Sequence, residues 1–104
     1  MARSLSVARV RVGLDKQGEY LSALRELAAL ASKRGQHIWV FKSQRTPDTF
    51  LEFSESPTPM SHRNLASRTP EEIRLEQRLH NVAAYDNEAG DLWEEVPLDI
   101  LSET

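Results

Sequence analysis

The chain has 104 residues, of which 39% are hydrophobic and 28% are charged, and its formal net charge is -3. These values predict one soluble domain, residues 1–104 with a core at about 5–98, and the negative charge excludes a broad electrostatic surface for nucleic acid. The absence of cysteine excludes disulfides, thiolate metal ligands and a cysteine nucleophile. No apolar stretch approaches the roughly 18 to 20 residues of a membrane span. We therefore expect a cytoplasmic protein that partners neither nucleic acid nor membrane.

A strand and a long helix are the first predicted elements. Residues 5–14 alternate with a period of two, which is typical of a strand. Residues 16–34 carry apolar side chains at three- and four-residue spacing, which predicts an amphipathic helix. Asp15 is placed to cap the start of this helix, and Gly35 is placed to end it.

A strand–turn–strand segment follows at residues 37–55. An apolar run predicts the first strand from His37 to Ser43, and residues 46–48 (Thr-Pro-Asp) are a turn sequence. Residues 49–55 alternate again, as a second strand would. This segment is therefore predicted to be a hairpin at the centre of the chain.

The rest of the chain predicts a loop, a helix and a last strand. The polar connection at 56–69 is longer than most, and loops of this length are often functional lids. Thr69, Pro70 and Glu72 form a capping-box sequence that begins the second helix, which we expect to end near Tyr85. Residues 92–96 are the last predicted strand, and Pro97 ends it.

The order of elements predicts a ferredoxin-like α+β fold, βαββαβ, whose four-stranded antiparallel sheet has the order 4-1-3-2 and carries both helices on one face. Pairing Val40 with Phe53 in the hairpin assigns the two faces. The face expected under the helices contains Ile38, Val40, Leu51 and Phe53 together with Ala8, Val10 and Val12. The opposite face then contains His37, Trp39, Phe41, Phe50 and Glu52 together with Arg9 and Arg11. Because this face is rich in aromatic residues, we expect a second copy to cover it in a two-fold homodimer.

From about residue 5 to residue 98 the chain resembles the dimeric α+β barrel superfamily. The resemblance rests on the element order, the length, the hairpin HIWVFKSQRTPDTFLEFSE, and the closing LWEEVPL, which is similar to the last strand of antibiotic-biosynthesis-monooxygenase-like members. NIPSNAP-like and stress-responsive A/B-barrel proteins are close alternatives. The resemblance implies two facing sheets that enclose a cavity, and oxygenation of a small aromatic or polyketide-like substrate without any cofactor. The alternative is a non-catalytic dimeric binding or stress-response module.

Five residues of the predicted cavity face are candidates for binding a small apolar or aromatic substrate. They are Arg9, Arg11, Trp39, Phe41 and Glu52. The two guanidinium groups would suit a carboxylate or enolate. The alternatives are a salt bridge from them to Glu52, or simple exposure to solvent if the face assignment is wrong. Trp39 would stack a flat ligand, or would instead anchor the dimer interface.

Other classes of chemistry lack a matching pattern. His37, His62 and His80 do not have metal-ligand spacing, so no metal site is predicted. The sequence has no phosphate-binding glycine loop and no nucleophile elbow. The Asn, Trp and His that haem-degrading members of the superfamily use cannot be placed, because His80 and Asn81 are adjacent. No catalytic residue is therefore assigned.

Overall fold

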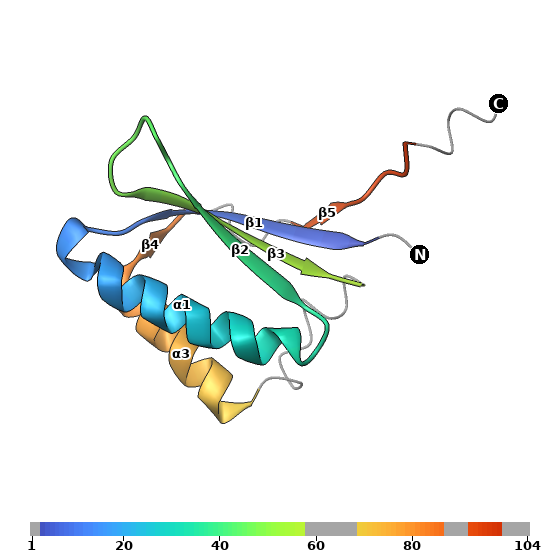
Figure 1. Ribbon diagram of the computed structural model, residues 1–104, viewed down its shortest axis with the longest axis horizontal. Helices are drawn as coiled ribbons and strands as arrows, with labels where there is room; N and C mark the ends of the chain where they lie inside the picture. The colour runs from blue at the N-terminus through green and yellow to red at the C-terminus, as the bar shows by residue number, and fades with distance from the viewer. Residues whose placement is uncertain (1–2, 58–68, 87–91, 99–104) are drawn as a thin grey trace.

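The computed structural model describes residues 3–57, 69–86 and 92–98, and these form an antiparallel sheet with two helices against one face (Figure 1). Its elements are β1 (Ser4–Arg11), the 3-10 turn η1 (Leu14–Lys16), α1 (Gln17–Ser32), β2 (His37–Lys42), β3 (Thr49–Ser56), α3 (Pro70–Val82), β4 (Ala84–Tyr85) and β5 (Leu92–Glu94). Most of the predicted lid, including His62, lies outside the described residues. No helix within the described ranges is both long and apolar enough to cross a membrane.

The sheet is organised around β1. Its strand order is β2-β3-β1-β4, and β5 also pairs with β1. β3 runs along one edge of β1, from the pair Ser4↔Ser56 to the pair Arg11↔Thr49. The other edge is shared, because β4 pairs with the end of β1 and β5 pairs with its beginning. When β4 and β5 are counted together as the fourth strand, the sheet has the predicted order 4-1-3-2. The prediction of a ferredoxin-like α+β fold is therefore confirmed.

The start of α1 differs from the prediction, and the helix ends at Ser32, two residues before the expected end at residue 34. Asp15 lies inside η1, which the bond from the Lys16 N–H to the Gly13 carbonyl closes at 2.8 Å. The residue that precedes α1 is Lys16, whose side chain makes no capping bond, so the predicted cap by Asp15 is wrong. Gly35 follows the helix with a φ of +80°, a left-handed conformation that glycine adopts without strain.

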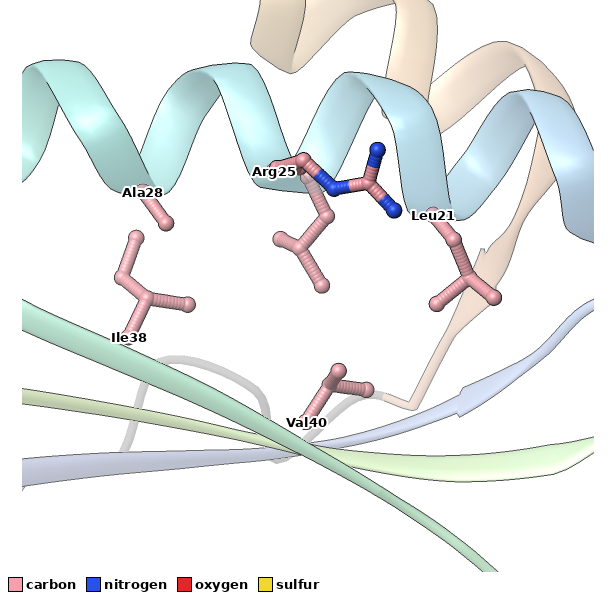
Figure 2. Close-up of a pocket in the computed structure, with 6 residues that line it drawn as sticks. Leu21, Arg25, Ala28, Ile38 and Val40 are labelled. Carbon is pink, nitrogen blue, oxygen red and sulfur yellow. The ribbon is translucent and has the colours of Figure 1, made fainter.

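The register of the β2–β3 hairpin is one residue away from the predicted one. Val40 pairs with Glu52 and not with Phe53. Directly paired residues share a face of the sheet, and Figure 2 shows Ile38 and Val40 pointing toward α1. Phe50 therefore packs under the helices, where its ring centroid lies 5.3 Å from that of Tyr20 and its side chain is 3% exposed.

A one-residue shift in register moves every side chain of β3 to the other face. Phe50 and Glu52 were predicted on the open face and lie on the helix face; Leu51 and Phe53 were predicted under the helices and lie on the open face. The face prediction for β3 is therefore wrong. For the first predicted strand, residues 5–14, it is confirmed, because Ala8, Val10 and Val12 are buried in the core.

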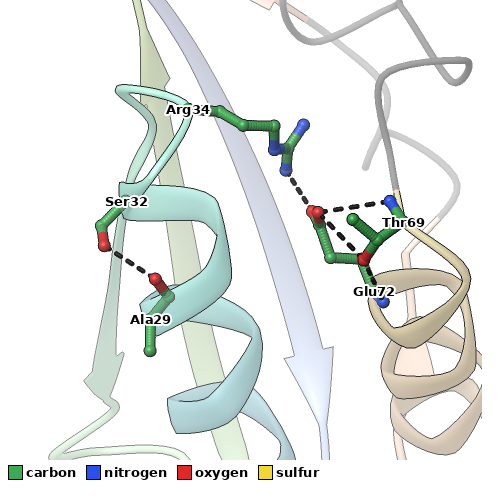
Figure 3. A network of polar contacts seen from close by, with 5 residues as sticks. All are labelled: Ala29, Ser32, Arg34, Thr69 and Glu72. Atoms are coloured by element: carbon green, nitrogen blue, oxygen red, sulfur yellow. Dashed lines mark hydrogen bonds and ion pairs between the residues drawn. The ribbon is translucent and has the colours of Figure 1, made fainter.

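The capping box of α3 forms as predicted. The Thr69 hydroxyl accepts a bond from the Glu72 N–H at 3.2 Å, and the Glu72 carboxylate accepts one from the Thr69 N–H at 3.4 Å. Arg34, which follows α1, donates to the same carboxylate at 2.5 Å (Figure 3). α3 ends at Val82, before the expected Tyr85, because the backbone becomes extended at Ala83 and leads into β4.

The core lies between the sheet and the helices. Its buried members are Ala8, Val10, Val12, Tyr20, Ala23, Leu24, Phe50, Leu75 and Leu79. Burial of this apolar surface is the main contribution to stability. The opposite face of the sheet has no described helix over it, so Trp39 and Phe41 remain 43% and 59% exposed.

Candidate functional site

Glu52 is the one acidic side chain that β3 directs into the layer between sheet and helices at mid-strand. It lies two residues after the buried Phe50 and therefore points to the same face. A carboxylate in such a place is costly unless other groups hydrogen-bond to it. The groups that hydrogen-bond to Glu52 therefore show whether this carboxyl group only stabilises the fold or is also placed to take part in a reaction.

Two tyrosine hydroxyls donate to the same oxygen of Glu52. The Tyr20 hydroxyl, from α1, lies 2.5 Å from Oε2, and the Tyr85 hydroxyl, from β4, lies 2.8 Å from it. Tyr20 is fully buried and Tyr85 is partly buried. Three elements thus converge on one carboxyl group, and no described residue donates to its other oxygen, Oε1, at hydrogen-bond distance.

Burial raises the pKa of Glu52 above its ordinary value of 4.5, because the charged form loses its hydration. The hydrogen bonds from Tyr20 and Tyr85 and the charge of His80 lower the pKa but offset only part of this effect. The pKa of each tyrosine is raised as well, by burial first and then by the negative charge of Glu52. Both phenols therefore remain hydrogen donors throughout the range in which Glu52 titrates.

A pocket of about 210 Å³ opens beside this carboxyl group. It is lined by Ser6, Ala8, Leu27, Glu52, Glu76, Leu79, His80 and Tyr85. The imidazole of His80 packs on the ring of Tyr85 with centroids 4.7 Å apart, at the exposed side of the pocket. The pocket thus combines apolar side chains with polar ones, among them a partly buried proton acceptor, and a small-molecule site needs both kinds.

No protein-family model matches this chain, and no curated protein matches it. Solved structures do match. SnoaB, a cofactor-independent oxygenase from Streptomyces nogalater, has a TM-score of 0.69 at 12% identity, over 93% of this chain and 94% of that chain. An antibiotic biosynthesis monooxygenase has a TM-score of 0.67 at 17% identity, over 93% of this chain and 100% of that chain. A conserved protein of unknown function from Bacteroides thetaiotaomicron has a TM-score of 0.70 at 17% identity, over 90% and 96%.

This chain has the fold of the antibiotic biosynthesis monooxygenases. The predicted resemblance is therefore confirmed at the level of the fold. No three His, Cys, Asp or Glu side chains in the described ranges are grouped closely enough to hold a metal ion.

The five predicted site residues divide between the two faces of the sheet. Arg9, Arg11, Trp39 and Phe41 lie together on the open face, as expected, and all four are exposed. Glu52 lies on the other face, so the alternative of a salt bridge from the two arginines to Glu52 is wrong. Whether the four open-face residues bind a substrate stays a prediction.

The open face carries two separate pairs of aromatic side chains in contact. The rings of His37 and Trp39 meet edge to face at 5.7 Å, and those of Phe41 and Phe53 do so at 5.4 Å. Trp93, which pairs with Leu5 across β5 and β1, lies on the same face and is 59% exposed. We call the residues Trp39, Phe41, Leu51, Phe53 and Trp93 the open-face patch.

Tyr20, Tyr85 and His80 were not predicted as site residues. Tyr20 lies within the first predicted helix, residues 16–34, and Tyr85 lies at the expected end of the second. The sequence signal that could have indicated them is Glu52 itself. A carboxylate two residues after a buried Phe50 points to the same face of the sheet, so it requires hydrogen-bond donors from elsewhere in the chain.

Proposed function

We propose that the protein is a cofactor-independent oxygenase that acts on a small aromatic or polyketide-like substrate in the pocket beside Glu52. The observation that carries the proposal is a carboxyl group with a raised pKa, fixed by two tyrosines, at the wall of a pocket that has both apolar and polar lining. The fold shared with SnoaB supports the reaction class. The pocket, rather than a cavity between two sheets, is the proposed place of the chemistry.

Glu52 would act as the general base. A carboxylate whose protonated form is favoured by burial is a stronger base than one in water, and Oε1 is the oxygen left to face a ligand. Removal of a proton from an activated CH₂ group gives an enolate, which O₂ can oxidise. The sum R₂CH₂ + O₂ → R₂C=O + H₂O balances, because O₂ supplies the new carbonyl oxygen and accepts the four electrons that the carbon loses. Glu52 returns the first proton to the peroxide that forms.

The proposed active form is a homodimer that buries the open-face patch. Aromatic side chains as exposed as Trp39, Phe41 and Trp93 are typical of an interface between protein chains. In such a dimer Arg9 and Arg11 would face the partner sheet, and the binding of a substrate anion by these residues belongs to this part of the proposal.

Oxygen uptake tests the function directly. Hydroxyaromatic ketones with an activated CH₂ group are screened as substrates at an oxygen electrode, and ¹⁸O₂ is traced into the product. We expect kcat/KM to rise with pH to a plateau, since Glu52 must lose its proton, with an inflection above 4.5. Glu52→Gln should lower kcat by at least about 100-fold. Glu71→Gln, at an exposed residue in the first turn of α3, is the matched control and should leave kcat unchanged.

Two outcomes would contradict the proposal. Equal turnover by Glu52→Gln and the wild type would remove Glu52 from the mechanism. Saturable binding of the ketones in this pocket without any oxygen uptake would instead support a non-catalytic binding module.

A further inference from the structure

A second pocket lies on a different side of α1, between that helix and the edge strand β2. It has a volume of about 240 Å³ and is lined by Leu21, Leu24, Arg25, Ala28, Ile38 and Val40. Figure 2 shows the side chains of Ile38 and Val40 opposite those of Leu21 and Ala28 across the open space. We call this space the α1–β2 groove.

The groove exists because two helices do not fully cover this sheet. β2 is at the edge of the strand order, so it has β3 as a neighbour on one side only. Ile38 and Val40 point toward α1 but are only partly buried, and Leu21 is 37% exposed. An apolar surface of this shape remains available to an apolar ligand.

Arg25 is the one charged residue in the lining of the groove. Its guanidinium lies on the helix side, between Ala28 and Leu21 (Figure 2). No acidic residue lies three or four positions away along the helix, and Arg25 makes no ion pair with a described residue. Arg34 and Arg78, by contrast, each pair with a glutamate.

We propose that the α1–β2 groove binds a small amphiphilic carboxylate, with its hydrocarbon part against the apolar walls and its carboxylate on Arg25. Guanidinium and carboxylate groups match in geometry and can form two parallel hydrogen bonds. The walls offer no second charge, so a single anionic head on an apolar body complements the groove in both shape and charge. This site does not depend on the proposed oxygenase function, because its lining shares no residue with the pocket beside Glu52.

Octanoate is the probe, with 1-octanol and octylammonium as ligands of the same length but different charge. We expect saturable binding of octanoate in titrations followed by amide NMR shifts, with the shifts centred on residues 21–28 and 38–40. Octanol should bind about tenfold more weakly or worse, and octylammonium should not bind. Arg25→Gln should weaken octanoate binding by about tenfold or more, whereas Arg25→Lys should keep part of it.

The matched control is Arg74→Gln, which removes an exposed arginine from α3 and should leave octanoate binding unchanged. Arg25 is itself exposed, so Arg25→Gln should retain its melting temperature. Octanoate binding that is equal in Arg25→Gln and the wild type, no saturable binding, or shifts centred elsewhere would overturn the proposal. So would concentration-dependent shifts of the groove amides without octanoate, which would indicate that a second copy of the chain occupies the groove.

Discussion

At Glu52, burial and hydrogen bonding act on one carboxyl group in opposite directions. Burial favours the protonated form and is the larger effect, whereas the two tyrosine hydroxyls favour the carboxylate. The protein therefore contains a proton acceptor that is both rigidly held and more basic than an ordinary glutamate. Such a carboxyl group destabilises the folded chain at high pH. Its protonation can therefore be followed through the stability of the protein, without a substrate.

Glu52→Gln should change how stability depends on pH. The folded pKa of Glu52 is raised, so the folded state binds more protons than the unfolded state between pH 4.5 and the raised value. Stability should therefore fall as pH rises through this window, by about 1.4 kcal/mol for each unit of the shift. Gln is neutral and its carbonyl accepts both tyrosine bonds, so the variant should lack this fall. Urea unfolding at pH 4 and pH 8 measures it; a variant less stable than wild type at pH 8 would contradict the expectation.

Tyr20→Phe and Tyr85→Phe should separate the two hydrogen bonds to Glu52. Tyr20 is fully buried, so water cannot replace its hydroxyl, whereas Tyr85 is partly exposed. We expect Tyr20→Phe to lower the free energy of unfolding at pH 8 by about 1.5–3 kcal/mol, the usual value for a bond to a charged group. The loss should be smaller at pH 4, where Glu52 is closer to neutral. Tyr85→Phe is the matched control, and an equal or larger loss in it would contradict the difference in burial.

At the scale of elements, the start of one helix was predicted correctly from the sequence and the start of the other was not. The start of α3 was predicted correctly because Thr69, Pro70 and Glu72 are neighbours in sequence, and their capping bonds need no other part of the chain. The start of α1 was not, because a 3-10 turn, closed by the bond from the Lys16 N–H to the Gly13 carbonyl, includes Asp15.

The register of β3 could not be read from its own sequence. Phe50 and Glu52 share one face and Leu51 and Phe53 the other, so counting apolar residues places the wrong pair in the core. What allows Glu52 to lie under the helices is Tyr20 and Tyr85, which are 32 and 33 residues away along the chain. The element order and strand order were therefore predictable, whereas the face that carries the candidate site was not.

Two ion pairs join α1 or its following turn to α3, and they differ in burial. Arg34–Glu72 is nearly buried, with side chains 23% and 3% exposed, whereas Arg78–Glu26 is open, with 40% and 57%. Glu72→Gln keeps a capping side chain but leaves Arg34 without its charge partner, and should cost about 1–3 kcal/mol. Glu26→Gln should cost at most about 0.5 kcal/mol. Thermal unfolding of the two variants measures both, and equal losses would show that burial does not decide the strength of these pairs.

At the scale of the whole molecule, the sheet has one covered face and one open face. The covered face contains Glu52 and its pocket, and the open face carries the open-face patch with Arg9 and Arg11. A monomer would leave large aromatic side chains in water, and their burial at about 25 cal/mol per Å² favours association. Both helices pack on one face of the sheet. This packing creates the pocket beside Glu52, and it also leaves the open-face patch uncovered for the proposed dimer to bury.

Phe41→Asp should convert the protein from dimer to monomer. Phe41 is 59% exposed on the open face, so a carboxylate there costs little in a monomer but would be buried against apolar groups in a dimer. Ile73→Asp is the matched control, since Ile73 is 45% exposed on α3, on the helix side of the sheet. Light scattering at micromolar concentration should give a dimer mass for the wild type and Ile73→Asp, and a monomer mass for Phe41→Asp. A monomeric wild type would contradict the proposed dimer, and a dimer lost only in Ile73→Asp would place the interface elsewhere than the open face.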